Sequence, residues 1–283
     1  MKIKKIFRAI IFICINIQVW SIPNMKDIPG GTVTKENVTI SVPSFYVSET
    51  KITVGDWKEY LKISKVSSIE NFERNACRVI DTYNAEIQDD YPVWGITWVE
   101  AILYCNWLSE QEGREKCYSY ENDKNKVKID YGANGYRLPN VKEWLYISEI
   151  YQDKPVEYYN KVNTIGLTIE KNPFIEIKAY PVKNMQKNFF GLYDVLGNLP
   201  EFCNDYYNEN FSFKDFTSHP YGPKDFTPDL DEIYFYGYPL YDVRCISGGY
   251  YYNSFAEIKQ MPIEPVSVVE TEYCSFRVVK NKS

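Results

Sequence analysis

The stretch Asn188–Asp205 constrains this chain most, because its glycines and acids dictate a tightly turned, irregular segment. Glycines bracket an apolar run within it, as turn residues do around a short buried segment. Asp194 and Glu201 stand seven residues apart, and Gly197 and Leu199 between them can present backbone carbonyls. Two carboxylates and two carbonyls match the oxygen ligands that a hard cation such as Ca2+ prefers. The residues equally allow a buried turn whose acids accept backbone N–H groups.

Composition narrows the class of protein. The chain has 283 residues, 45% of them hydrophobic, which is enough to bury a large core in one or two domains. The formal net charge is −6, and Lys and Arg cluster only in the first eight residues, so nucleic-acid binding is disfavoured. The 26 Tyr, 15 Phe and 6 Trp suit a loop-rich core or a surface that binds through flat aromatic contacts.

Residues 1–21 have the pattern of a signal peptide. A basic start is followed by the apolar run Ala9–Trp20, and Val19 and Ser21 stand at the −3 and −1 places of a cleavage site. The run is too short to span a bilayer, so we expect an exported protein (periplasmic, cell-surface or secreted) with no membrane-spanning segment after signal removal. An uncleaved anchor is the alternative, and a lipid anchor through Cys14 stays open.

The mature chain keeps an even number of cysteines, which permits disulfides in an exported protein without fixing their pairing. They are Cys77, Cys105, Cys117, Cys203, Cys245 and Cys274. The absence of a CxxC pair and the single His219 argue against a zinc or haem site.

Short helices and strands alternate with irregular structure, which predicts an α+β class. Thr97–Gln111 is the clearest helix, with Thr97 as cap and Glu100 as its capping-box partner. A second helix is expected from Val141 to about Tyr151, capped by Asn140 with Glu143. We further expect an extended lead-in at 22–36, a strand over Phe45–Thr53, a helix over Val54–Ile63, an aromatic insertion at 206–242, and strands over Cys245–Tyr252 and Cys274–Lys280.

Five segments stand in register along one domain at residues 37–283. They are FYVSETKIT (45–53), YPVWGITWVEAILYCNWLS (91–109), NGYRLPNVKEWLY (134–146), the stretch Pro181–Asn204, and SGGYY (247–251) followed by SFRVV (275–279). Together they resemble the formylglycine-generating enzyme (sulfatase-modifying factor) family, whose fold is a variant of the C-type-lectin fold. The resemblance therefore implies that variant fold, with much irregular structure between short elements.

The resemblance also implies particular ligands. It places a structural Ca2+ on the four residues of the first stretch, namely Asp194, Gly197, Leu199 and Glu201. A second family site would fall near Asn163 and Thr164, where no acidic partner is evident, and this site stays open. A family disulfide between the long helix and the C-terminal end implies a Cys105–Cys274 bond.

The resemblance fails at the chemistry. Catalytic members of the family oxidise a substrate cysteine to formylglycine with O2, using two copper-binding cysteines shortly after the second glycine turn. Those positions hold Asn253 and Ile258 here. Because Cu(I) requires soft thiolate ligands, copper is not expected. The resemblance thus implies a pseudoenzyme, without formylglycine-generating activity.

The expected function is an exported, Ca2+-stabilised binding or structural module for a protein or peptide. The residues expected to face the ligand follow the glycine turn and are Tyr250, Tyr251, Tyr252 and Asn253. One alternative is an active family enzyme, an oxidase on a peptide substrate or a hydrolase with rearranged chemistry. Its candidate groups are Asn253, Ser254, Glu257, Tyr251 and Tyr252. Another is a surface-displayed lectin-like receptor or adhesin, since lectin-like relatives diversify this segment.

Overall fold

The structure is a computed structural model. It describes residues 22–64, 88–120, 127–162, 179–208, 210, 212–223, 234–235, 238–239, 243–249, 253–260, 263–267 and 274–282. The expected signal peptide, Cys77, the open second calcium site near Asn163 and Thr164, and Tyr250, Tyr251 and Tyr252 lie outside these ranges.

A four-stranded antiparallel sheet joins the two ends of the domain. Its strand order is β1 (Met25–Ile28), β4 (Phe45–Ser48), β13 (Val279–Asn281) and β7 (Tyr136–Arg137). Val47 pairs with Lys26 on one side and with Val279 on the other. The expected lead-in therefore contributes β1 to the sheet. β1 pairs with β4, and β4 pairs in turn with the C-terminal strand β13.

The two strands expected over 45–53 and 274–280 are both shorter in the structure. Beyond Ser48 the chain bends, and Ser48 Oγ donates to the carbonyl of Thr50 at 2.8 Å. The segments nevertheless stay side by side, because Ile52 N donates to the carbonyl of Phe276 at 2.8 Å. Outside the ladder of β4 with β13, the two segments are thus joined by single hydrogen bonds.

A second antiparallel sheet has the order β12 (Ile263–Ser267), β11 (Val243–Ser247) and β8 (Glu201–Tyr206). The expected glycine bend is present, since Gly248 and Gly249 have φ of 111° and 67° and follow β11 directly. Only glycine adopts such angles freely, so this pair ends the strand.

The remaining strands form separate two-stranded ribbons. β2 (Gly31–Lys35) and β3 (Val38–Val42) are joined by a two-residue loop whose φ angles, 51° at Glu36 and 64° at Asn37, are those of a type I′ hairpin. The others are β5 (Tyr118–Tyr120) with β6 (Val127–Ile129), and β9 (Tyr234–Phe235) with β10 (Tyr238–Pro239) inside the expected aromatic insertion.

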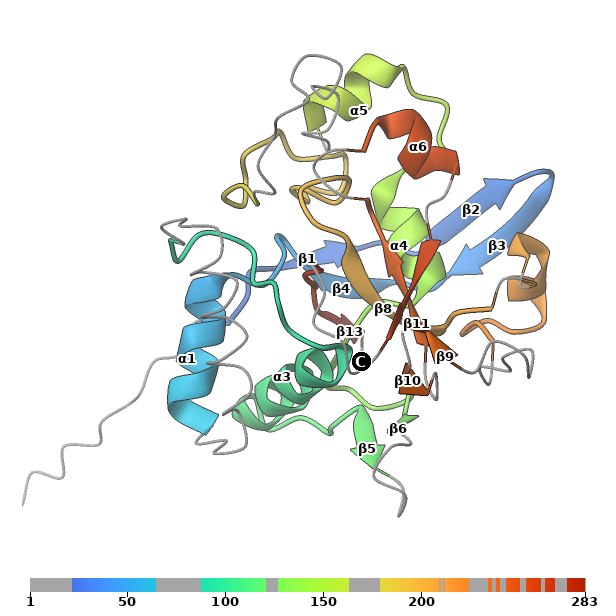
Figure 1. The fold of residues 1–283 in the computed structure, drawn as a ribbon. Coiled ribbons are helices and arrows are strands. Elements are labelled where there is room, and N and C mark those ends of the chain that lie inside the picture. Colours follow the sequence, from blue (N-terminus) through green and yellow to red (C-terminus); the bar gives the residue numbers. More distant parts are fainter. Residues whose placement is uncertain are drawn as a thin grey trace, which may run out of the picture.

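The helices are short and surround these sheets. They are α1 (Val54–Ser64), α3 (Trp98–Gln111), α4 (Val141–Ser148), α5 (Val156–Val162) and α6 (Phe255–Gln260), with a 3-10 turn η2 at Phe213–Thr217. Figure 1 shows α1 and α3 next to each other, while α4 lies against the β2–β3 hairpin.

Both expected capping boxes are confirmed. In α3, Glu100 N donates to Thr97 Oγ1 at 3.1 Å and Thr97 N donates to Glu100 Oε2 at 2.7 Å. Asn140 and Glu143 exchange the equivalent bonds in α4, which ends at Ser148 because Glu149 turns into the left-handed region.

Loss of the α3 cap gives a first test. Replacing Thr97 by alanine leaves the first-turn N–H of Glu100 without its acceptor, so we expect the free energy of unfolding to fall by about 1 kcal/mol. Thr97→Ser keeps the hydroxyl and should retain most of that stability. Urea unfolding followed by circular dichroism measures both variants, and equal losses in the two would contradict a capping role.

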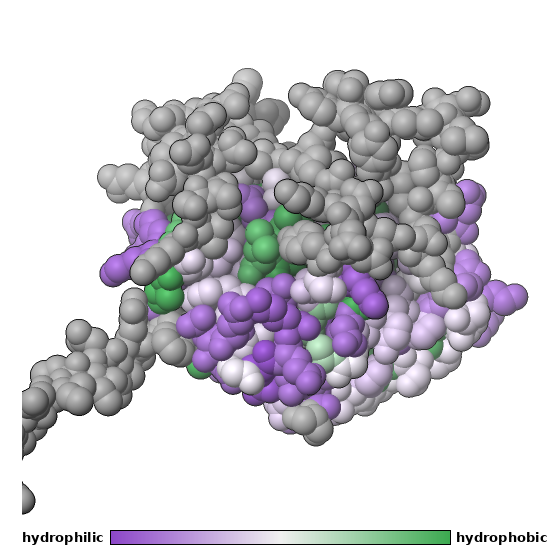
Figure 2. Space-filling view, turned by 90° about the horizontal axis from the view of Figure 1, so that it is seen from below, coloured by the Kyte–Doolittle hydropathy of each residue, from purple (hydrophilic) through white to green (hydrophobic). Residues whose placement is uncertain are grey.

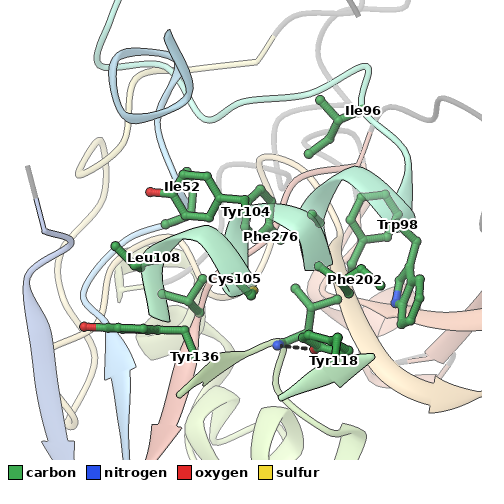
Figure 3. Close-up of a cluster of buried hydrophobic side chains, with 14 of the residues drawn as sticks. Ile52, Ile96, Trp98, Tyr104, Cys105, Leu108, Tyr118, Tyr136, Phe202 and Phe276 are labelled. Carbon is green, nitrogen blue, oxygen red and sulfur yellow. Dashed lines mark hydrogen bonds between the residues drawn. The ribbon is translucent and has the colours of Figure 1, made fainter. Parts of the chain in front are cut away.

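The larger core cluster lies beneath α3 and is rich in aromatic rings. Tyr104 stacks on Trp57 with ring centroids 5.6 Å apart and meets Phe276 edge-on at 5.4 Å. Figure 3 shows Cys105 on the same helix within this cluster. Cys105 is a free buried thiol, so the expected Cys105–Cys274 disulfide is not formed in the structure. Packing alone closes this part of the core.

The surface is mostly polar on the side seen in Figure 2. Described residues there are mainly hydrophilic or intermediate, and apolar ones show as separate spots. Within the described ranges, every helix is too short or too polar to cross a lipid bilayer.

Candidate functional site: a buried ion cluster and a glycine turn

Glu201, the first residue of β8, is fully buried and lies at the centre of an ion cluster. The chain just before β13 runs beside it, since Phe202 N donates to the carbonyl of Ser275 at 3.0 Å. This brings Arg277 against Glu201 in a two-pronged ion pair, with Nε 2.6 Å from Oε2 and Nη2 2.7 Å from Oε1. Such a fork is among the strongest ion pairs that proteins make.

A second buried cation, Lys51, completes the cluster. Its Nζ lies 2.8 Å from Glu201 Oε1 and 3.5 Å from the carbonyl oxygen of Gly197, and it also donates to the carbonyl oxygen of Asp194. Trp144 Nε1 donates to Glu201 Oε2 at 3.2 Å. The glutamate therefore accepts from three different side chains.

The loop that carries the expected calcium ligands curls around this lysine. Asp194 and Gly197 have φ of 50° and 80°, in the left-handed region that lets successive carbonyls turn inward. Leu199 is buried in the same loop. Asp194 Oδ2 accepts from the backbone N–H of Lys183 at 2.6 Å, while Asp194 Oδ1 is buried without a hydrogen-bond partner.

The charges in the cluster shift one another's pKa values. Burial alone would raise the pKa of Glu201, but Arg277 and Lys51 outweigh it and hold that pKa below its usual value. Burial lowers the pKa of Lys51 against the opposing pull of Glu201. Burial likewise raises the pKa of Asp194, although Lys51 opposes this.

These residues do not fit a calcium ion in this arrangement. A carboxylate offers about four lone-pair positions, and those of Glu201 are filled by two bonds from Arg277 and one each from Lys51 and Trp144. Calcium takes six to eight oxygen ligands, whereas Asp194 Oδ1 is the one carboxylate oxygen here without a partner. Across the part of the chain that the structure describes, no three His, Cys, Asp or Glu side chains are placed to share a metal ion.

The glycine turn after β11 contacts both residues that stand at the family's copper positions. A Cβ at Gly249 would lie 2.5 Å from Ile258 Cγ1 and 3.1 Å from Asn253 Oδ1. The side chain of Ile258 is buried and belongs to the second apolar cluster. An apolar side chain thus fills the space that a ligating thiol would need.

Ser254 and Glu257 have a structural role. Ser254 N donates to Glu257 Oε2 at 2.6 Å, and Glu257 N donates to Ser254 Oγ at 3.2 Å. These two bonds are a capping box at the start of α6, and they account for both polar groups. The Ser254 hydroxyl is thereby used as an acceptor from the backbone.

Two buried cysteines lie in the same apolar cluster as Ile258. Cys203 on β8 contacts Ser247 Oγ at 3.8 Å, and Cys245 on β11 contacts the carbonyl of Tyr206 at 3.5 Å. Burial raises the pKa of both thiols well above its ordinary value. The neutral thiol is therefore favoured over the thiolate that binds copper or reacts.

The amino-acid sequence is similar to a known family domain and to a named protein. Residues 16–282 match the sulfatase-modifying factor enzyme 1-like domain. The chain is 30% identical over 198 residues to the chaperone protein LppX of Paenibacillus barcinonensis; the match covers 59% of this chain and 64% of that protein, which is less than two thirds of its length.

Solved structures share the fold at low identity. The Treponema denticola variable protein 1 superposes with a TM-score of 0.63 at 21% identity, covering 91% of this chain and 95% of that one. CarF gives 0.60 at 15% identity, with 92% and 99% covered, and PvdO from Pseudomonas aeruginosa gives 0.58 at 16%, with 92% and 95% covered. These similarities agree with the expected variant of the C-type-lectin fold, and with the family match they show that this chain belongs to the sulfatase-modifying factor (formylglycine-generating enzyme-like) family.

Proposed function

We propose that this protein is an exported, protein-binding member of its family that does not generate formylglycine. The observation that carries the proposal is the packing of Ile258 against Gly249, at a position where catalytic relatives place a copper-binding thiolate. Isoleucine has no atom that ligates a metal, and the neighbouring Asn253 offers an amide, a poor ligand for Cu(I). The oxidation step therefore lacks the metal on which it depends.

A binding role accounts for the scaffold that remains. A relative that is 30% identical over 198 residues is named a chaperone protein, which favours a polypeptide ligand. The residues that we propose for this contact follow the glycine turn and are Tyr250, Tyr251, Tyr252 and Asn253, since tyrosines supply large contact areas at low entropic cost.

Export is the second part of the proposal, supported by the signal-peptide pattern of residues 1–21. The mature protein would then begin at Ile22, three residues before β1. Intact-mass measurement of the protein recovered outside the cytoplasm should give the mass of a chain that starts at Ile22.

The oxidase half of the proposal is tested with copper and a cysteine peptide. We expect the purified mature chain to lose Cu(I) to a competing chelator and to leave the peptide thiol intact, as read by mass spectrometry. The variant Asn253→Cys/Ile258→Cys is the matched control, because two thiolates at those positions should retain Cu(I). Conversion of the peptide cysteine to formylglycine by the unmodified protein would overturn the proposal. Copper retention lost in Cys203→Ser/Cys245→Ser would assign the metal to those two cysteines instead.

The binding half is tested with a permanently unfolded probe, reduced and carboxymethylated α-lactalbumin. Replacing the three tyrosines 250–252 by alanine should raise the dissociation constant of this probe about tenfold or more, the scale expected for aromatic contact residues. Tyr221→Ala removes an exposed tyrosine outside this segment and should leave the constant unchanged. Equal binding by the two variants, or no binding by the wild type, would contradict the proposal.

The receptor or adhesin alternative depends on sequence variation in residues 250–275. Of these, residues 250–252, 261–262 and 268–273 lie outside the described part of the chain. Clustered sequence variation in that segment among isolates would favour display, whereas uniform variation along the chain would favour the role proposed above.

A further inference from the structure

We infer that the ammonium group of Lys51 is the cation of the loop around Gly197, so that the scaffold holds together without a bound calcium ion. This inference rests on the ion cluster and the family fold, and it is independent of the proposed function.

The ammonium group of Lys51 lies among the residues that the family pattern assigns to calcium. Lys51 Nζ contacts oxygens of three of the four residues that the family pattern assigns to calcium, namely the carbonyls of Asp194 and Gly197 and the carboxylate of Glu201. The lysine side chain is completely buried. Its charge therefore lies where a bound cation would lie, and the loop carbonyls are already turned toward it.

The charges of the buried cluster balance without a further ion. Lys51 and Arg277 carry two positive charges, and Glu201 and Asp194 carry two negative charges, so the four buried groups are formally neutral together. A divalent ion added to this set would leave two uncompensated positive charges in the protein interior. Unpaired buried charge is strongly unfavourable, so the set as built opposes calcium.

The distance between Lys51 and Glu201 is that of a hydrogen bond. Glu201 Oε1 lies 2.8 Å from Lys51 Nζ, which is normal for a hydrogen bond from an ammonium group. Calcium requires oxygens at roughly 2.3–2.6 Å on all sides. Because Lys51 is part of the chain, its charge cannot be lost by dilution or chelation.

Calcium removal tests the inference on the wild-type chain. We expect the purified mature protein to carry no calcium by atomic-emission analysis and to have the same Tm in excess EGTA as in millimolar Ca2+. One bound calcium per chain, together with a lower Tm in EGTA, would overturn the inference. This result needs no variant, so it stands even if the variants below fail to fold.

Replacing the lysine tests its role as the cation. Lys51→Ala should lower Tm by roughly 6–15 °C, because Glu201 then lacks one of its two cations and the carbonyls lose their donor. Refolding this variant with n-propylammonium, which restores the missing part of the side chain, should recover part of that loss. Lys58→Ala is the matched control, since Lys58 makes its ion pair with Asp89 on the surface, and it should change Tm by about 1–2 °C at most. A Lys51→Ala variant as stable as Lys58→Ala would contradict the inference.

A failure here would leave the proposed function intact. A bound calcium ion would change how the scaffold is stabilised, whereas the copper and unfolded-probe experiments measure what the protein does. The two sets of measurements are therefore read separately.

Discussion

Replacing Glu201 by glutamine is expected to lower the free energy of unfolding by about 3–5 kcal/mol. The side chain keeps its size, but Lys51 and Arg277 are then buried together without the carboxylate that separates them. Glutamine also adds an amide N–H donor, which finds no acceptor because each position around the carboxylate is occupied by an N–H. The repulsion between the two cations and the unsatisfied donor both destabilise the folded state.

The loss is measured as a lower guanidinium concentration at the unfolding midpoint, with the denaturant dependence of the unfolding free energy (the m value) unchanged. Glu110→Gln is the matched control, because Glu110 pairs with Lys116 on the surface, with side-chain exposures of 52% and 47%. Exposed pairs contribute little, so its effect should stay below about 1 kcal/mol. A loss for Glu201→Gln as small as that of Glu110→Gln would mean that the buried cluster does not stabilise the fold.

Stability is also expected to fall as pH rises from about 4 to about 7, because of Asp205. This residue of β8 is buried, and its Oδ2 accepts from the backbone N–H of Val141 at 2.7 Å. Burial raises the pKa of Asp205 to about 7, and the nearby Glu143 charge adds to this, while Arg244 opposes it.

The sign follows from proton binding. Between the ordinary carboxyl pKa of about 4 and the folded value of about 7, the folded state holds a proton that the unfolded state has released. Stability from this group is therefore complete below pH 4 and is lost as pH rises, by roughly 4 kcal/mol at most across the window.

Asp205→Asn removes the titration and should flatten this part of the pH profile. The amide can still accept from Val141 through its oxygen, so the fold should be retained. Asp215→Asn is the contrast, because hydrogen bonds from Ser212 lower the pKa of Asp215, so its contribution changes only below the ordinary carboxyl pKa of about 4 and its loss should leave the slope above pH 4 unchanged. Urea unfolding from pH 4 to pH 8.5 measures all three proteins. A wild-type slope unchanged in Asp205→Asn would contradict the assignment.

The elements that the sequence predicted correctly are those encoded locally. The caps at Thr97 and Asn140 each lie three residues before their glutamate partner, so the whole motif is visible in four residues. The helix Val54–Ser64 and the bend at Gly248 and Gly249 are local in the same way. Family resemblance then supplied the fold, which no local pattern specifies.

Features that depend on distant contacts were not predictable in the same way. Lys51 and Glu201 are 150 positions apart in the sequence, and nothing near Glu201 indicates which cation it meets. A signal did exist, because the segment 45–53 ends in Lys51-Ile52-Thr53 where the family pattern ends in Glu-Val-Thr. Reversal of a charge at a position next to the core indicates a changed ion partner. The Cys105–Cys274 bond, which the family resemblance implied, is not formed in the structure, where Cys105 is a free thiol.

The place of β13 between β4 and β7 has a consequence for the order in which the chain matures. Val47 on β4 can pair with only one neighbouring strand until Val279, more than two hundred residues later in the chain, becomes available. Contacts of such long sequence separation form slowly, since loop closure must precede them. β1 and β4 therefore stay without the strand that joins them to β7 until residues 279–281 are available to pair, and a chain interrupted before Val279 lacks the centre of this sheet.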